Sequence, residues 1–142
     1  MSNLTSTFQK PDPTPTKAPS IYFNAYLSSD YRSSGVVPFN KLKDSSSVNG
    51  FDVKSGKFNS PVDGLYFFYF YYQSSSDGSI YPGIYVNGTR KCHAYTEQNW
   101  QTHSCAIVIK LTKGQSVYID GSNSAGINSA QYSGFVGYLI SQ

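Results

Sequence analysis

Residues 51–70, FDVKSGKFNSPVDGLYFFYF, constrain the fold of this chain more than any other segment. Both phases of a two-residue alternation near its end are apolar. One phase consists of Tyr66, Phe68 and Phe70, and the other of Leu65, Phe67 and Tyr69. Successive side chains of a strand point to opposite faces, and a strand that is apolar on both faces is covered on both. We therefore predict a central strand with Phe68 in the core and the other phase against a second layer, such as another subunit.

The rest of the chain also has the pattern of β-structure. Short apolar and aromatic runs are separated by turn-forming Gly, Asn, Asp and Ser residues, and no segment has an apolar period near 3.6. Asn87-Gly88 between two such runs predicts a two-residue hairpin turn. The runs predicted as strands are residues 20–28, 36–39, 56–59, 64–74, 80–86, 90–97, 100–111, 116–121 and 133–140. This spacing predicts an all-β sandwich or jelly roll of about ten strands.

The 142 residues are predicted to form one globular domain preceded by a tail. Residues 11–20 hold four of the seven prolines, which disfavour both helix and central strand. We assign residues 1–19 to a proline-rich tail and residues 20–142 to the domain.

Charge and hydropathy exclude several classes of partner. Only 13% of the residues are charged and the net charge is +3, without a Lys/Arg run or a phosphate-binding glycine loop. This argues against nucleic-acid binding. There is no apolar run long enough to insert into a membrane. The first ten residues lack the apolar stretch of a signal peptide, so either the chain is not secreted or it is a mature form with an added Met1. We expect the second, a secreted chain from which the signal peptide has been removed.

The expectation of secretion rests on the two cysteines. If Gln98-Asn99 forms the centre of a hairpin, Cys92 lies directly opposite Cys105, close enough for a disulfide. Such a bond indicates an extracellular protein. The alternative is two buried free thiols in a cytosolic protein. Zinc binding with His93 and His103 is disfavoured, because neighbouring residues of a strand face opposite ways.

The sequence does not predict an enzyme. None of the eight carboxylates forms a motif with His93 or His103. Ser104 and His93 would be neighbours in the proposed hairpin, but no nucleophile elbow or oxyanion loop accompanies them. No catalytic residue, cofactor or metal ligand is therefore assigned.

Ligand binding has more support. In the proposed hairpin His93, Tyr95 and Trp100 share a face, and such side chains stack on sugar rings and bond their hydroxyls. Arg90 and Tyr81 lie at the margin, where Arg90 could meet the carboxylate of sialic acid. The alternative is that Tyr95 and Trp100 pack into the sandwich or a subunit interface.

Two further features are left open by the sequence. The loop at residues 74–83 contains Asp77 and is a second candidate surface, since binding groups often lie on loops. Asn3-Leu4-Thr5 and Asn87-Gly88-Thr89 match the glycosylation sequon, a pattern that also arises by chance.

The spacing Phe51, Phe58, Gly64-x-Tyr66-x-Phe68-x-Phe70 resembles the signature of the complement-1q globular head family, a branch of the tumour-necrosis-factor-like jelly rolls. Residues 109–117 and 133–139 resemble two later segments of the same family. Asn40 and Ser46 depart from the upstream pattern, so Phe39 and Asp44 fit only with a length change. Gln115 replaces the usual Asp.

The resemblance implies a jelly roll that assembles as a homotrimer, consistent with the doubly apolar strand. Head-only members without collagen include invertebrate lectins of innate immunity. The leading hypothesis is therefore a secreted lectin that binds glycans or glycoproteins, including sialylated ones. The alternatives are a structural or adhesive extracellular protein and a trimeric receptor ligand. Some members bind calcium, but this chain has no carboxylate run that supports it.

Overall fold

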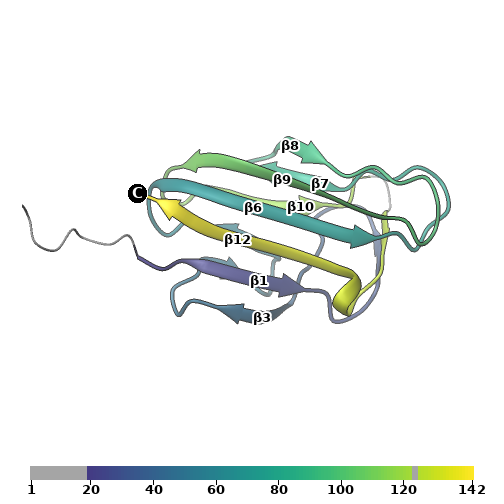
Figure 1. Cartoon of the computed structure of the whole chain (residues 1–142), viewed down its shortest axis with the longest axis horizontal. Helices are drawn as coiled ribbons and strands as arrows, with labels where there is room; N and C mark the ends of the chain where they lie inside the picture. Colours follow the sequence, from purple (N-terminus) through teal and green to yellow (C-terminus); the bar gives the residue numbers. More distant parts are fainter. Residues whose placement is uncertain (1–18, 123–124) are drawn as a thin grey trace, which may run out of the picture.

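The computed structural model describes residues 19–122 and 125–142, which form two five-stranded antiparallel sheets packed face to face (Figure 1). The sheets have the strand orders β3-β1-β12-β6-β9 and β4-β5-β10-β7-β8, and β11 pairs with β2. The elements are β1 (Tyr22–Tyr26), β2 (Tyr31–Ser33), β3 (Lys41–Ser45), β4 (Phe51–Asp52), β5 (Lys57–Asn59), β6 (Gly64–Gln73), β7 (Gly83–Val86), β8 (Thr89–His93), β9 (Thr102–Leu111), β10 (Ser116–Asp120), β11 (Ala125–Ile127), η1 (Ala130–Tyr132) and β12 (Ser133–Ser141). The sheet that contains β6 is called the first sheet below, and the sheet that contains β7 the second sheet.

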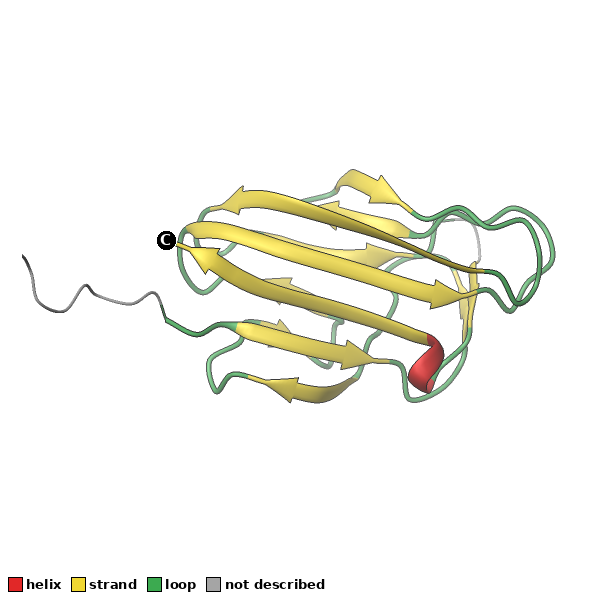
Figure 2. Ribbon diagram, viewed as in Figure 1, coloured by secondary structure: helices red, strands yellow, loops and turns green. Residues whose placement is uncertain are grey.

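The core between the sheets is mainly aromatic. Phe68 of β6 is 0% exposed, and its ring centroid lies 5.2 Å from that of Phe58 on the opposite sheet. Phe23 of β1 also stacks on Phe58, at 5.4 Å. The prediction that the Phe68 phase points inward is confirmed. Figure 2 shows that the described chain is otherwise strand and loop apart from the one-turn 3₁₀ helix η1, so the predicted all-β jelly roll is confirmed as well.

The Asn87-Gly88 hairpin is confirmed. Asn87 and Gly88 have φ angles of 49° and 87°, and β7 and β8 flank them with Val86 opposite Thr89. Two successive residues with positive φ define the turn whose twist matches that of the strands.

Other predictions are wrong. Residues 90–97 and 100–111 do not form a hairpin, because β8 pairs with β7 and β9 pairs with β6. Residues 36–39 contribute only an isolated bridge from Val36 to Asp120. The short strands β2, β3, β4 and β11 were not predicted. Most of the predicted tail and the Asn3 sequon lie outside the described residues.

Candidate functional site

A disulfide joins the edges of the two sheets. Cys92 in β8 is bonded to Cys105 in β9, with 6.2 Å between the Cα atoms, and both side chains pack against the core. The predicted bond is confirmed, although the hairpin from which it was inferred is wrong: Cys92 lies opposite Ile84, and Cys105 opposite Phe70. The bond leaves neither thiol free for zinc. Among the described residues, no three His, Cys, Asp or Glu side chains gather as a metal site.

Residues 93–104, which the disulfide closes, cross from one sheet to the other at the end of the sandwich opposite the C-terminus (Figure 1). Tyr72 anchors this segment from the core, since its hydroxyl lies 2.8 Å from both the Ala94 carbonyl oxygen and Thr96 Oγ1. Burial raises the pKa of Tyr72 to about 12. Thr96 also exchanges backbone hydrogen bonds with Ile80. The segment is therefore held at one side against the core and the preceding loop.

The other end of the segment presents Trp100 to solvent. Trp100 is 67% exposed and has a φ of 70°, a conformation that a residue with a bulky side chain rarely adopts. Its backbone N–H donates to the Ser74 carbonyl at 2.7 Å, and Gln101 Oε1 accepts the N–H groups of Glu97 and Gln98. These bonds hold the turn that projects Trp100. It does not pack into the sandwich of its own chain.

Residues on either side of Trp100 in the sequence line a hollow of about 230 Å³. Its lining residues are Tyr95, Thr96, Gln101, Thr102 and His103. Tyr95 is 43% exposed, and its hydroxyl bonds Ser79 Oγ at 2.8 Å. His103 Nδ1 accepts the N–H of Ser104 at 2.8 Å. The hollow thus offers one aromatic ring, one imidazole and several hydroxyl or amide groups.

The remaining predicted residues lie apart from this hollow. Arg90 Cζ lies 5.8 Å from the centroid of the Tyr81 ring, and Arg90 is paired with Tyr85 of β7. His93 is exposed at the end of β8, opposite Gly83. The structure therefore groups Tyr95 with His103 and Arg90 with Tyr81, and it does not gather all five predicted residues at one point.

The sequence did not predict a row of tyrosines on the outer face of the second sheet. Tyr85 and Tyr118 stack with centroids 5.8 Å apart and an interplanar angle of 13°, and Lys57 Nζ lies 4.9 Å from the Tyr118 centroid. The register Tyr118 to Tyr85 to Arg90 connects this pair to the Arg90–Tyr81 contact. In the sequence, the only indication of this row is that each of the two stacked tyrosines lies between aliphatic residues, which are buried in the structure.

The outer face of the first sheet has an apolar centre. Tyr138, Phe67 and Val108 are direct neighbours across β12, β6 and β9. The rings of Phe67 and Tyr138 lie 5.2 Å apart, and Val108 and Tyr138 remain 59% and 44% exposed. Phe67 belongs to the second apolar phase of the strand predicted from residues 64–74. A single chain leaves this face uncovered.

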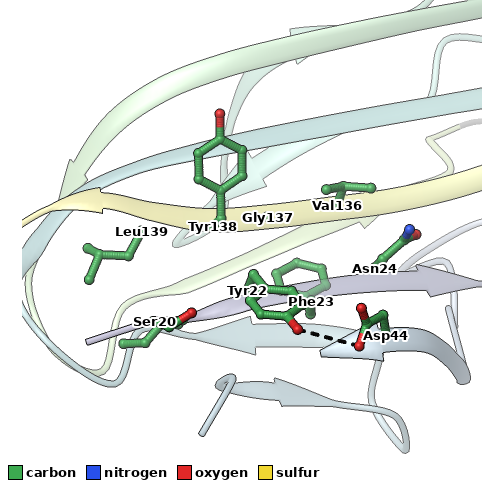
Figure 3. Close-up of a pocket in the computed structure, with 10 residues that line it drawn as sticks. Ser20, Tyr22, Phe23, Asn24, Asp44, Val136, Gly137, Tyr138 and Leu139 are labelled. Atoms are coloured by element: carbon green, nitrogen blue, oxygen red, sulfur yellow. Dashed lines mark hydrogen bonds between the residues drawn. The ribbon is translucent and has the colours of Figure 1, made fainter. Parts of the chain in front are cut away.

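A pocket of about 490 Å³ adjoins that apolar face between β1 and β12 (Figure 3). Figure 3 shows Tyr138 standing away from β12, while Tyr22 and Asp44 approach each other, with 3.4 Å between the Tyr22 hydroxyl and Asp44 Oδ1. Val136 and Leu139 supply the apolar side of the pocket.

No helix among the described residues has the length and apolarity needed to cross a membrane.

Comparison with known proteins identifies the family. The C1q domain family matches residues 22–140, nearly the whole described chain. The chain belongs to the C1q domain family. It is 35% and 34% identical over 97 residues to complement C1q tumor necrosis factor-related protein 3 of Mus musculus and of Homo sapiens. Those matches cover 65% of this chain and 39% of each relative, so the chain spans about two fifths of their length.

Solved structures agree on the fold. The globular domain of zebrafish complement 1qA superposes with a TM-score of 0.72 at 21% identity, covering 86% of this chain and 98% of that one. Murine APRIL superposes with a TM-score of 0.70 at 10% identity, covering 85% and 98%. These similarities show the jelly roll that C1q domains share with tumour-necrosis-factor-like proteins.

The family signature has a structural explanation here. Phe58, Phe68 and Phe70 are core residues, and Phe51 stacks on Phe23 at 4.6 Å. A Cβ at Gly64 would lie 2.6 Å from Leu139 Cδ1, so a side chain there would collide with β12.

The departures from the family pattern are also accommodated. Phe39 is fully buried, 6.1 Å from the ring of Phe70. Gln115, where the family has Asp, accepts the N–H of Thr112 at 2.8 Å through its side-chain oxygen and so closes the turn between β9 and β10.

Proposed function

We propose that this C1q domain is a secreted, homotrimeric recognition protein that binds glycans through the loop end that carries Trp100. The observation that carries the proposal is the exposure of Trp100, whose sequence neighbour Gln101 lines the hollow together with Tyr95 and His103. Exposing a large aromatic ring in a left-handed turn has a cost that packing within the chain does not offset. A ligand that stacks on the ring would offset it.

The hollow has the chemistry of a shallow sugar site. The faces of sugar rings are apolar and stack on Trp and Tyr, while their hydroxyls accept and donate hydrogen bonds. Tyr95 supplies a ring, and His103, Thr102 and Gln101 supply polar groups. The preference for sialylated glycans was predicted from Arg90, which lies against Tyr81 and apart from the hollow. The site is therefore to be tested with both neutral and sialylated glycans.

A homotrimer would cover the apolar face of the first sheet. Three copies of this chain, each presenting Phe67, Val108 and Tyr138, would remove that face from water. Placing the loop end of every subunit on one assembly would also join three weak sites into one multivalent surface. We expect sedimentation at micromolar concentration to give about three times the chain mass, and a monomer would refute the assembly.

A glycan array followed by agglutination of sialylated cells tests the lectin function. Trp100→Ala should abolish binding and leave the trimer and its melting temperature unchanged. Tyr132→Ala, which removes another exposed ring 46% open to solvent, is the matched control and should bind normally.

If both variants bind equally, Trp100 is not in the site. If Trp100→Ala dissociates the trimer, the ring belongs to a subunit interface. If the wild-type protein binds no glycan, the lectin function is wrong. Capture of a cell-surface protein would then identify the chain as a receptor ligand, and self-association would identify it as an adhesive protein.

A further inference from the structure

We propose that the outer face of the second sheet is a separate binding surface for sulfated linear polysaccharides. We call the five residues that form it the cation–tyrosine ladder. They are Lys57, Tyr118, Tyr85, Arg90 and Tyr81. This inference goes beyond the glycan site at the loop end, because it uses different residues on a face of the sandwich.

The ladder runs across the strands rather than along one of them. Lys57 lies on β5, Tyr118 on β10, Tyr85 on β7 and Arg90 on β8, which are consecutive strands of the sheet. Three strand intervals place the two cationic strands about 14 Å apart. A ligand that meets both cations therefore has to be extended, with negative charges repeated along its length.

Both cations are available to such a ligand. Among the described residues, Lys57 and Arg90 form no ion pair, and each cation lies against a tyrosine ring. Asp52 lies opposite Lys57 and accepts the Lys54 N–H at 2.9 Å; it stays ionised but forms no ion pair with Lys57. Asp120 accepts the Ser122 N–H at 2.8 Å. The ring contacts hold the cations over the sheet at little further entropic cost.

The arrangement of the rings favours a polysaccharide over a nucleic acid. One face of Tyr118 is occupied by the Lys57 ammonium group, and the same ring stacks on Tyr85. Nucleobases need open ring faces for stacking. The ladder instead offers cations, which pair with sulfate groups, and half-buried phenols, whose hydroxyls bond sugar hydroxyls. The proposed homotrimer uses the other sheet, so three ladders would remain accessible.

Heparin is the probe, and its affinity for the full chain is measured by titration at several NaCl concentrations. Lys57→Gln/Arg90→Gln should lower the affinity about tenfold or more and reduce the slope of log affinity against log salt by about two, because two cations no longer displace counterions. Lys41→Gln/Lys113→Gln is the charge-matched control, at two exposed positions away from the ladder, and should change the affinity much less. Tyr85→Phe/Tyr118→Phe keeps the rings and should lose several-fold affinity.

Equal losses in the two lysine-containing pairs would overturn the proposal, because net charge alone would then explain binding. Displacement of heparin by single-stranded DNA at equal charge concentration would overturn the polysaccharide class. Circular dichroism establishes that each variant is folded. Trp100→Ala should keep full heparin affinity, so failure of the loop-end site and failure of the ladder are distinguishable.

Discussion

Removal of the Cys92–Cys105 bond should both destabilise the sandwich and loosen the candidate loop site. The bond closes a chain segment with a sequence separation of 13 and connects β8 to β9 at one side of the two sheets. In the chain-entropy treatment a loop of this length contributes about 3 kcal/mol to the free energy of unfolding. For a domain of this size the change corresponds to a melting temperature lower by about 10 °C.

The same segment carries Tyr95, Trp100 and His103, so the bond also limits the motion of the proposed binding groups. The Tyr72 hydroxyl bonds and the Trp100–Ser74 backbone bond remain in the variant and should preserve the strands. We therefore expect a native far-ultraviolet spectrum at 20 °C, together with weaker glycan binding.

Thermal unfolding of Cys92→Ala/Cys105→Ala, followed by circular dichroism, measures the effect. Wild-type protein in excess reductant is the matched control and should melt at a similar temperature, while reductant should not affect the variant. A decrease below about 3 °C would refute the entropic argument. Unchanged glycan binding in the variant would show that the loop is ordered by its hydrogen bonds alone.

Three further predictions concern the core, and denaturant or thermal unfolding measures each of them. Phe68→Ala should cost roughly 3–5 kcal/mol, because the ring is fully buried; a cost below about 1 kcal/mol would place it outside the core. Gly137→Ala should cost about 1–3 kcal/mol, since the new Cβ would lie 2.5 Å from Phe23 Cε1, and Gly88→Ala, with open space around it, should show only backbone strain. Tyr72 is buried with its pKa raised to about 12, so the stability present below pH 10 should decline as the pH rises toward 12, and less so in Tyr72→Phe.

The sequence predicts what depends on alternation within one strand. In β6, Phe68 and Phe70 are buried while Phe67 and Tyr69 are partly exposed, as the two-residue period requires. The inward side of β9 follows the same rule, which is why Cys105 could be placed on one apolar face with Ile107 and Ile109. Cys92 was placed through the hairpin register, which is wrong. Burial parity is a local property and needs no knowledge of which strands are neighbours.

Strand pairing is local only at a tight turn such as Asn87-Gly88, and the second predicted hairpin was wrong. Proximity in the chain suggested that residues 90–97 pair with residues 100–111, but Cys92 and Cys105 belong to different sheets. The connecting segment leaves the sheet after His93 because Ala94 and Thr96 are bonded to the buried Tyr72. The bonding partner lies some twenty residues upstream, so no hairpin rule could reveal it.

The candidate sites differ in predictability for the same reason. Tyr95 and His103 come from one segment, and chemistry along that segment suggested a ligand site. The ladder combines Lys57, Tyr85 and Tyr118, which are neighbours only because β10 lies between β5 and β7. Without the sheet order these residues are three isolated polar positions.

We infer different roles for the outer faces of the two sheets. Phe67 and Val108 make the outer face of the first sheet costly to leave in water, whereas on the second sheet Tyr85 and Tyr118 stack beside Lys57. Ring contacts occur on both faces, since Phe67 also lies 5.2 Å from Tyr138. The faces differ in chemistry: Phe67 and Val108 have no polar group, whereas Tyr85 and Tyr118 carry hydroxyls and lie next to Lys57. This difference is our reason for proposing self-assembly through the first sheet and charged ligands on the second.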